Sequence, residues 1–420
     1  MKSLYNIAIW FYALAVRIVA FFNRKVRLMW RGEREAYAKI ESGLADGDRV
    51  VWVHAASLGE FEQGRPLIEK LKRENPEYKI LLTFFSPSGY EVRKNYAGAD
   101  VIAYLPLDTS RNARRFVELV KPEKVVFVKY EFWLNYLAEL RFSGIETYII
   151  SAIFRSNQVF FKWYGGIFRE GLKAFKMLFV QNEESKELLK GIGVENVVVA
   201  GDTRFDRVAD IAAAAKKLEI VERFVNSQLP VLVVGSSWGP DEDLLTRYIN
   251  ERAGRMKMII APHEVREERI KELTSKLTCK YALYTHITDE SQLSTLNSFD
   301  VLVVNTIGVL SSVYQYGQVA YIGGGFGVGI HNTLEAAAWG MPVVFGPNYH
   351  KFQEAKELIE CGAGWSIKNY EECARALDEF FEKNEVASKA AAEYVASHTG
   401  ATELIYNSQF IVHNYSPVGS

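Results

Sequence analysis

Residues 50–66 read VVWVHAASLGEFEQGRP and pass from a strand into a helix. The apolar run Val50–Val53 is typical of a parallel-sheet strand that is buried on both faces. Small residues follow, and Glu60 stands where the helix begins. Open α/β folds bind ligands at such junctions. A carboxylate there suits proton transfer better than phosphate binding, so we predict that Glu60 is a general base. The alternative is that Glu60 only stabilises the first turn of its own helix.

Strand-like runs alternate with amphipathic helical stretches from residue 49 onward, which predicts two doubly wound α/β domains. The first domain is expected at 48–205, after a membrane-associated helix and basic flank at 1–47. The second is expected at 206–397, and 398–420 forms a terminal helix for which we consider packing on the first domain. The expected strands are 49–54, 79–83, 101–105, 124–128, 146–151, 177–181 and 197–200, then 230–234, 257–261, 281–284, 301–304, 319–322 and 342–345; the last helices are 370–383, 386–397 and 401–413. Two such domains facing each other across a cleft suit a nucleotide-dependent transferase.

The amino-terminal stretch 4–22 is almost wholly apolar and precedes a basic cluster. At about 100° per residue, Asn6, Arg17 and Arg24 fall on one narrow polar stripe. The charges follow the apolar run, whereas a cleaved signal peptide carries them before it. We favour a helix lying in the membrane interface, with a single span or a helix packed on its own domain as alternatives. Both membrane interpretations place the main body on the cytoplasmic side. The basic cluster consists of Arg24, Lys25, Arg27, Arg31 and Arg34.

Composition limits the possible functions. The chain has 420 residues, 49% of them hydrophobic, so each domain can bury a core. A net charge of −1 gives no overall attraction to nucleic acid. The three cysteines form neither a paired framework nor a metal spacing, which favours a reducing compartment. We see no metal-ligand spacing among His, Asp and Glu, and we expect no metal and no cofactor.

A glycine-rich segment at 321–347 reads YIGGGFGVGIHNTLEAAAWGMPVVFGP. A strand ending at Ile322 runs into glycines, and a helix is expected to open near His331–Thr333. Exposed backbone N–H groups at such a junction favour phosphate, and Glu335 could accept hydrogen bonds from ribose hydroxyls. We therefore predict a nucleotide-phosphate site; the alternative is a flexible loop before a core helix.

A second candidate is VLVVGSSWGPDEDLL at 231–245, where Ser236 and Ser237 bind phosphate or carboxylate, or one of them is an N-cap.

Six segments together resemble the Kdo transferases. They are HAASLGE (54–60), TFFSPSGYE (83–91), EFWLN (131–135), GDTRFD (201–206), GSSWGPDED (235–243) and GGGFGVGIHNTLEAAAWGMPVVFGP (323–347). The resemblance implies the GT-B glycosyltransferase fold, an amino-terminal acceptor domain and a membrane-associated amino terminus. It implies transfer of Kdo from CMP-Kdo onto a lipid A precursor, lipid IVA, in lipopolysaccharide synthesis. The expected location is the cytoplasmic face of the cell inner membrane.

The resemblance also implies roles for individual residues. Glu60 matches the catalytic glutamate of the family and would take the proton of the attacking hydroxyl. We expect the donor to contact Ser236, Ser237, His263, Gly325, Gly329, His331, Asn332 and Glu335. We expect the acceptor to contact Ser57, Gly59, Ser86, Ser88, Glu131 and Arg155. A family arginine for the donor is displaced in APHEVREER (261–269), where Arg266 is the candidate replacement. His54 is interpreted as a structural histidine, and His331 either donates to phosphate or has a structural role.

Two other functions remain open at this point. One is another GT-B enzyme that uses a UDP-sugar, either a lipid-linked glycosyltransferase or a 2-epimerase. The other is a membrane-bound scaffold without catalysis. Nucleic acid is not expected as a partner.

Overall fold

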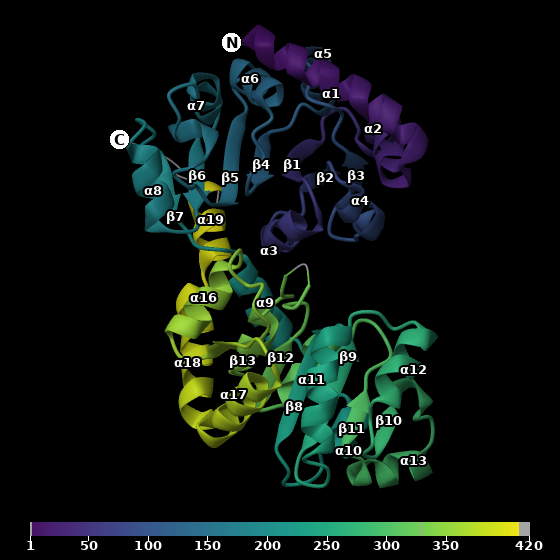
Figure 1. The fold of residues 1–420 in the computed structure, drawn as a ribbon. Coiled ribbons are helices and arrows are strands. Elements are labelled where there is room, and N and C mark those ends of the chain that lie inside the picture. Colours follow the sequence, from purple (N-terminus) through teal and green to yellow (C-terminus); the bar gives the residue numbers. More distant parts are fainter. Residues whose placement is uncertain (1, 328, 411–420) are drawn as a thin grey trace, which may run out of the picture. The chain divides into compact units, whose positions relative to one another are not determined.

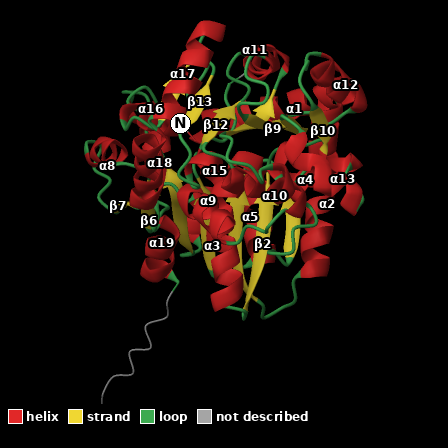
Figure 2. Ribbon diagram, turned by 90° about the horizontal axis from the view of Figure 1, so that it is seen from below, coloured by secondary structure: helices red, strands yellow, loops and turns green. Residues whose placement is uncertain are grey.

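The computed structural model describes residues 2–327 and 329–410. These residues form two compact units, one of residues up to 207 together with the segment from 399, and one of residues 208–398. Each unit contains one seven-stranded sheet in which all pairings are parallel. Helices cover both faces of each sheet (Figures 1 and 2). This is the doubly wound α/β class that the alternating pattern predicts.

The sheet of the first unit has the order β3-β2-β1-β4-β5-β6-β7. Its strands are β1 (Arg49–Ala55), β2 (Tyr78–Phe84), β3 (Val101–Tyr104), β4 (Lys124–Val128), β5 (Glu146–Ala152), β6 (Met177–Val180) and β7 (Val197–Val199). Its crossover helices are α3 (Leu58–Glu74), α4 (Pro87–Arg93), α5 (Ser110–Val120), α6 (Leu134–Phe142), α7 (Gly166–Leu172) and α8 (Glu183–Lys190). The strand order reverses direction at β1, so the loops after β1 and β4 flank the switch point at which such sheets bind ligands.

The apolar residues of β1 fill both sides of this sheet because successive side chains point to opposite faces. Trp52 packs with Phe116 and Phe127 on one side, with ring centroids 4.7 and 5.4 Å away. Val53 packs with Phe61 of α3 on the other side. Both layers are apolar and buried, which explains why polar residues do not alternate along β1.

Two helices precede the first sheet. They are α1 (Lys2–Phe22) and α2 (Arg24–Gly43), and Asn23 caps α2 by accepting hydrogen bonds from the N–H groups of Lys25 and Val26. The prediction that Arg24 continues the polar stripe of residues 4–22 is therefore wrong, because the chain turns at Asn23. The interpretation of residues 24–47 as only a basic flank missed a helix that packs on β3, where Gly32 lies directly against the Tyr104 ring.

The sheet of the second unit has the order β10-β11-β9-β8-β12-β13-β14. Its strands are β8 (Val231–Ser237), β9 (Lys257–Pro262), β10 (Tyr281–Leu283), β11 (Val301–Val303), β12 (Val319–Ile322), β13 (Val343–Phe345) and β14 (Gly364–Ser366). Its helices are α10 (Glu219–Phe224), α11 (Gly239–Asn250), α12 (Glu267–Ser275), α13 (Glu290–Thr295), α14 (Leu310–Val313), α15 (Leu334–Ala337), α16 (Gln353–Glu360), α17 (Tyr370–Glu382) and α18 (Asn384–His398). The sequence pattern missed β14, which has no β-branched residue.

The chain leaves the first unit within α9 (Arg204–Ala213) and returns to it in α19 (Ala401–Gln409). Asp206 accepts hydrogen bonds from the N–H groups of Gly400 and Thr402 at 2.6 and 2.7 Å. Ile405 is fully buried in the core layer that also contains Phe61. The last helix is thus a structural part of the first unit. The predicted extension of this helix to residue 413 lies partly outside the described residues.

Candidate active site

Glu60 lies in the first turn of α3, at the carboxyl end of β1. Its Oε2 accepts a hydrogen bond from the Ser57 hydroxyl. Ser57 occupies the N-cap position in extended conformation, yet its side chain bonds to Glu60 and not to the helix backbone. A Cβ at Gly59 would meet only the Ser57 hydroxyl, at 3.8 Å, so packing alone does not require glycine there. The turn therefore presents an oriented carboxylate beside open space.

The next loop, between β2 and α4, is joined to the Glu60 turn through the backbone. The N–H groups of Phe85 and Ser86 both donate to the carbonyl of Ala56, at 3.2 and 2.7 Å. Ser86 caps α4, and its hydroxyl lies 2.9 Å from that of Ser88. A Cβ at Gly89 would stand 3.0 Å from the Ser57 carbonyl carbon, so the two loops approach closely. Ser57, Ser86 and Ser88 are thus brought to one edge of the sheet.

Glu131 follows β4 and contacts the buried end of β1. Its Oε2 lies 3.1 Å from His54 Nε2 and accepts a hydrogen bond from Trp133 Nε1 at 2.5 Å. His54 Nδ1 lies 2.9 Å from the Thr83 hydroxyl, and the imidazole is fully buried. The structural role predicted for His54 agrees with this closed environment. Glu131 is 9% exposed, so only its edge is available to a ligand.

A pocket of about 590 Å³ lies beside Glu131. Arg155 lines it and donates to the Tyr130 hydroxyl at 2.8 Å. Tyr5 from α1 also lines it, and its hydroxyl donates to the buried carboxylate of Asp108 at 2.5 Å. Burial raises the pKa of Tyr5, so this phenol remains a donor over the physiological range. The contributions of Tyr5, Tyr130 and Trp133 were not predicted from the sequence.

Strained backbone marks the carboxyl ends of several strands. Lys129 after β4, Ser151 in β5 and Ser236 in β8 have φ of 68°, 50° and 55°. Residues other than glycine rarely adopt this region, and such strain concentrates at functional sites. The distribution supports a ligand-binding role for these strand ends in both units.

In the second unit, three aromatic side chains meet at the carboxyl ends of β8, β9 and β12. The His263 ring stacks with Trp238 and with His331, at 4.5 Å and 25° in each case. Trp238 Nε1 donates to His331 Nε2 at 3.1 Å. Burial, and then the charge of His263, lower the pKa of His331, so its imidazole is neutral at pH 7. Because Nε2 accepts, the proton of the neutral ring must reside on Nδ1.

The glycine-rich loop is fixed to α11 by Asp241. This buried carboxylate accepts hydrogen bonds from the N–H groups of Gly324 and Trp238, at 3.0 and 2.9 Å, and from the Tyr321 hydroxyl at 2.9 Å. A Cβ at Gly325 would stand 2.6 Å from the backbone of Gly346, so no other residue fits there. Gly329 has φ of 136° and packs beside Phe352. The described residues of this loop, 323–327 and 329, therefore pack closely against α11, Gly346 and Phe352.

The helix expected after this loop is a single turn, α15. Asn332 stands before it and donates to Glu335 Oε1 at 3.0 Å, while its Oδ1 accepts from the N–H of Leu334 at 3.1 Å. Gly340, with φ of 69°, ends the turn soon afterwards. Asn332 and Glu335 thus form one polar pair, but a long helix dipole does not reinforce it.

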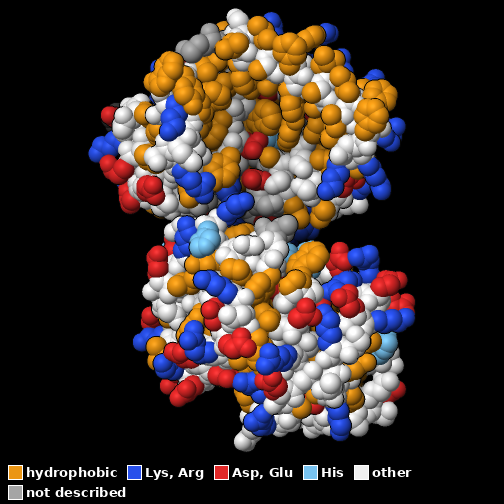
Figure 3. All heavy atoms as spheres, in the orientation of Figure 1, with side chains coloured by type: hydrophobic (Ala, Val, Ile, Leu, Met, Phe, Trp, Pro, Cys, Tyr) orange, Lys and Arg blue, Asp and Glu red, His pale blue; other side chains and the backbone are white. Residues whose placement is uncertain are grey.

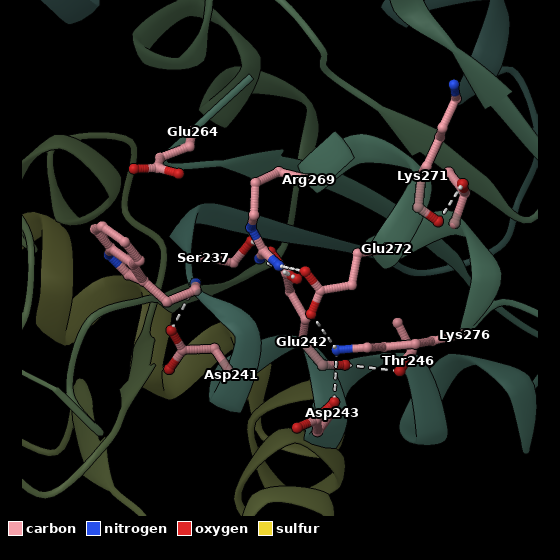
Figure 4. A network of polar contacts seen from close by, with 12 residues as sticks. Ser237, Asp241, Glu242, Asp243, Thr246, Glu264, Arg269, Lys271, Glu272 and Lys276 are labelled. Atoms are coloured by element: carbon pink, nitrogen blue, oxygen red, sulfur yellow. Dashed lines mark hydrogen bonds and ion pairs between the residues drawn. The ribbon is translucent and has the colours of Figure 1, made fainter. Parts of the chain in front are cut away.

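Ser236 and Ser237 belong to β8, not to a turn, and Trp238 occupies the N-cap position of α11. The Ser237 hydroxyl is buried and donates to Glu242 Oε1 at 3.2 Å (Figure 4). Arg269 Nη2 donates to Glu242 Oε2 at 2.7 Å. Burial raises the pKa of Glu242, and Arg269 opposes that change. Ser236 is therefore the more accessible of the two serines.

Arg266, the candidate replacement for a donor arginine, is exposed and forms an ion pair with Glu264. Arg269, the other arginine of that segment, pairs with Glu242 and Glu272 and therefore has a structural role. In the part of the chain that the structure describes, no group of three or more His, Cys, Asp and Glu side chains could hold a metal ion.

Comparison with known proteins identifies the class. Residues 29–207 match the family model of 3-Deoxy-D-manno-octulosonic-acid transferase (kdotransferase). The 3-deoxy-D-manno-octulosonic acid transferase of Aquifex aeolicus (strain VF5) is 29% identical over 79% of this chain and 85% of its own. That of Bordetella pertussis is 27% identical over 89% of this chain and 92% of its own.

Among solved structures, the UDP-GlcNAc 2-epimerase from Neisseria meningitidis bound to UDP-GlcNAc superposes with a TM-score of 0.59. It covers 86% of this chain and 99% of its own at 17% identity, which supports the fold alone. The two parallel sheets have the GT-B fold, and the transferase relatives indicate a glycosyltransferase. Within that class, residues 29–207 match the Kdo transferase family model, and the chain is similar to 3-deoxy-D-manno-octulosonic acid transferases over most of its length.

Proposed function

We propose that this enzyme transfers Kdo from CMP-Kdo onto a lipid A precursor. The observation that carries the proposal is the position of Glu60, an oriented carboxylate at the carboxyl end of β1 in a chain of the Kdo transferase family. Its Oε2 is held by Ser57, and no other described residue donates to Oε1. Oε1 is therefore available to accept the proton of a sugar hydroxyl.

The proposed reaction is a single displacement. The deprotonated acceptor hydroxyl forms a bond with the anomeric carbon of Kdo, while the bond from that carbon to the phosphate oxygen of CMP breaks. Glu60 receives the hydroxyl proton, and CMP leaves with the bonding electron pair. No covalent enzyme intermediate is needed, and the anomeric configuration inverts.

The second unit is proposed to bind the nucleotide. The neutral His331 keeps its Nδ1–H free of the Trp238 contact, so this group can donate to the departing phosphate. The backbone of residues 323–327 and 329, held by Asp241 at Gly324, is proposed to bind a phosphate, and the Asn332–Glu335 pair suits ribose hydroxyls. Ser236, His263 and Gly325 complete the proposed donor contacts.

The acceptor is proposed to bind the first unit, at Ser57, Gly59, Ser86, Ser88, Glu131 and Arg155. These residues follow β1, β2, β4 and β5, and the pocket beside Glu131 offers aromatic walls with one arginine. An aromatic pocket with a guanidinium suits an amphipathic acceptor that bears phosphate.

The amino-terminal helix is proposed to lie in the membrane interface at the cytoplasmic face. Residues 3–22 are long and apolar enough to cross a membrane, and only 11% of this stretch is buried. However, α1 is attached to the first unit along its length: Asn135 Nδ2 donates to Asn6 Oδ1 at 2.9 Å, and Val16 and Ala20 are buried at the other end. Such attachment favours a helix lying along the surface over one that departs to span the bilayer.

The outward side of this unit supports the same proposal. Trp10, Phe11 and Phe22 of α1 are 61%, 59% and 87% exposed, and Trp163 before α7 is 91% exposed. Figure 3 shows hydrophobic side chains gathered over the unit that contains α1, whereas charged side chains predominate on the visible face of the other unit. Large exposed apolar areas of this kind mark interaction with membranes or partners.

The test is mass spectrometry of lipid IVA incubated with CMP-Kdo and the full chain. We expect mass increments that correspond to added Kdo, and no increments with the Glu60→Gln variant. A wild-type protein that binds CMP but adds no Kdo to lipid IVA would overturn the assignment of the acceptor.

A further inference from the structure

Glu33 of α2 carries an unusual buried oxygen. Burial raises the pKa of its carboxyl group, and the backbone N–H of Leu107 opposes this change. Its Oε1 is buried and has no hydrogen-bond partner among the described residues. Leaving such a group unpaired costs free energy, so native proteins usually supply a partner. The proposed catalytic sites do not use this residue.

A cavity of about 220 Å³ lies against Glu33. It is lined by Arg17 from α1, by Trp30, Arg34 and Tyr37 from α2, and by the loop between β3 and α5. Arg34 lies over the Trp30 ring, with its guanidinium 5.3 Å from the centroid. Neither Arg17 nor Arg34 forms a hydrogen bond or ion pair with another residue in the described ranges, and both are exposed. The cavity thus combines a buried carboxyl group with two available guanidinium groups.

Burial raises the pKa of Glu33 to about 8, so its carboxyl group is protonated at pH 7. In that state Oε1 or Oε2 carries an O–H donor and no charge. The ionisable groups near it are Tyr12 and Arg17 of α1, Arg34 and Tyr37 of α2, Tyr104 of β3, Asp108 after β3, and Tyr136 of α6. The Asp108 carboxylate accepts hydrogen bonds from the Tyr5 hydroxyl and from the backbone N–H groups of Asn135 and Tyr136, so it is already paired. Among the described residues that line the cavity, Glu33 is the only acidic one.

We propose that this cavity binds the phosphate of a membrane phospholipid headgroup. The Arg17 and Arg34 guanidinium groups would pair with the phosphate oxygens, and the protonated Glu33 would donate a further hydrogen bond. The volume accommodates a headgroup but no sugar nucleotide. The proposal rests on the interfacial position of α1, since Arg17 belongs to the apolar helix and Arg34 to the next one. It gives α1 a specific lipid contact in addition to apolar insertion.

The experiment uses the full chain and monomeric short-chain lipid, so that membrane association is not required for binding. Dihexanoyl phosphatidylglycerol is titrated by calorimetry at pH 7, with glycerol 3-phosphate and dihexanoyl phosphatidylethanolamine as parallel probes. We expect the Arg17→Gln, Arg34→Gln double variant to bind phosphatidylglycerol about tenfold or more weakly. Arg114→Gln is the matched control, because Arg114 is an exposed arginine of α5 outside the cavity.

The Glu33→Gln variant separates two effects of Glu33 on lipid binding, the hydrogen bond donated by its protonated form and the repulsion by its ionised form. Glutamine retains an N–H donor, so affinity at pH 7 should stay within about threefold of wild type. Wild-type affinity should fall between pH 7 and pH 9, because ionised Glu33 repels the phosphate, and this fall should disappear in Glu33→Gln. Loss of affinity in Glu33→Gln, with tighter binding of phosphatidylethanolamine than of phosphatidylglycerol, would indicate an ammonium site and overturn the proposal.

Two further outcomes are decisive. Equal affinity for glycerol 3-phosphate would assign the cavity to a free phosphate and overturn the lipid assignment. Unchanged affinity in the double arginine variant would place the lipid elsewhere. CMP binding by the same samples shows that each variant is folded, and Kdo transfer is assayed separately. Failure of the headgroup site is therefore distinguishable from failure of the proposed transferase function.

Discussion

His263 and His331 stack at a centroid separation of 4.5 Å, although they follow different strands of the second sheet. The contact joins the segment after β9 to the glycine-rich loop after β12. Burial and, to a smaller extent, the charge of His263 lower the pKa of His331, so the contact adds to the preference of His331 for the neutral state. The glycine-rich loop is thus electrostatically coupled to the segment after β9.

The His263→Gln variant should raise the pKa of His331, since the nearby like charge is removed. Burial is the larger cause of the lowered pKa, so the value should remain below 6.5. Because the pKa of His331 is lower in the folded protein than in the unfolded chain, the unfolded chain binds more protons. The folded protein therefore loses stability as the pH falls below 6.5. Histidine ring resonances followed by NMR against pH measure this. An unchanged His331 titration would contradict the coupling.

The Glu60→Gln variant should lose about 10²–10⁴ in turnover, because a general base is removed from the transition state. CMP affinity should stay near wild type, since Glu60 belongs to the other unit of the chain. Steady-state assays and calorimetry measure the two quantities. The control is Glu62→Gln in the same helix, where Glu62 instead pairs with Arg93. Near wild-type turnover of Glu60→Gln would remove this residue from the mechanism.

Asn332→Ala and Glu335→Ala should each weaken CMP binding by about tenfold to hundredfold, as expected for a lost hydrogen bond to a charged partner. Isothermal titration with CMP measures this, and UDP in the same assay tests base selectivity. Asn369→Ala is a suitable control because Asn369 caps α17 in the same unit. If both variants bind CMP normally, the site lies elsewhere, with Ser236 as the next candidate. Preference for UDP would contradict the Kdo-transferase donor.

Serine substitutions at Trp10 and Phe22 should each weaken vesicle binding by about tenfold to hundredfold, because about 1.5–3 kcal/mol is lost when a large apolar side chain no longer enters the membrane. These side chains point away from the protein, so the fold should be retained. Neutralising Arg24 and Lys25 should weaken binding mainly at low salt, at about 1 kcal/mol per charge. Sedimentation with anionic vesicles measures both effects. Unchanged sedimentation in the serine variants would show that α1 is not the anchor.

The Glu33→Gln variant should stabilise the protein at pH 8 but not at pH 4.5. The pKa of Glu33 is raised from 4.5 to about 8, so the unfolded chain loses this proton first and stability falls as the pH rises between these values. Glutamine removes this loss, and the difference between variant and wild type should grow by roughly 2–4 kcal/mol across that range. Denaturant unfolding followed by circular dichroism measures it. A difference that does not depend on pH would mean that Glu33 ionises normally.

Much of the fold could be predicted because the strands are continuous β-branched runs, as in Val50–Val53 and Val125–Val128. The strand β14 escaped because Gly364–Ser366 gains its strand character only from pairing with β13. Helix α2 was missed because only a few of its residues are buried and charged residues stand between them. One of the buried residues is Gly32, whose place in the helix depends on close packing against the Tyr104 ring. The central strands of each sheet can therefore be predicted from the sequence, whereas the elements that depend on tertiary packing cannot.

The candidate site divides in the same way. Glu60, Asn332 and Glu335 stand within local motifs that predict a strand, a turn and a helix. Tyr5, Trp133 and Asp241 could not be predicted as candidate site residues, since their contacts with Asp108, His54 and Gly324 join segments far apart in the chain. The GDTRFD segment resembled a functional motif, but Asp202 is buried against Gln63 and Arg204 and links α3 to α9. Arg204 lowers the pKa of Asp202 against the opposing effect of burial.

The return of α19 to the first unit has a consequence for biogenesis. The ribosome synthesises α1 long before α19, yet both helices belong to the same unit. The capping of Gly400 and Thr402 by Asp206, and the burial of Ile405, can form only after the whole second unit has been translated. The nascent chain therefore exposes its apolar helix α1 while the unit that contains this helix still lacks its last core element. Truncation after residue 207 would leave a permanently unfinished core, so the two halves of this enzyme should not be expected to mature as independent fragments.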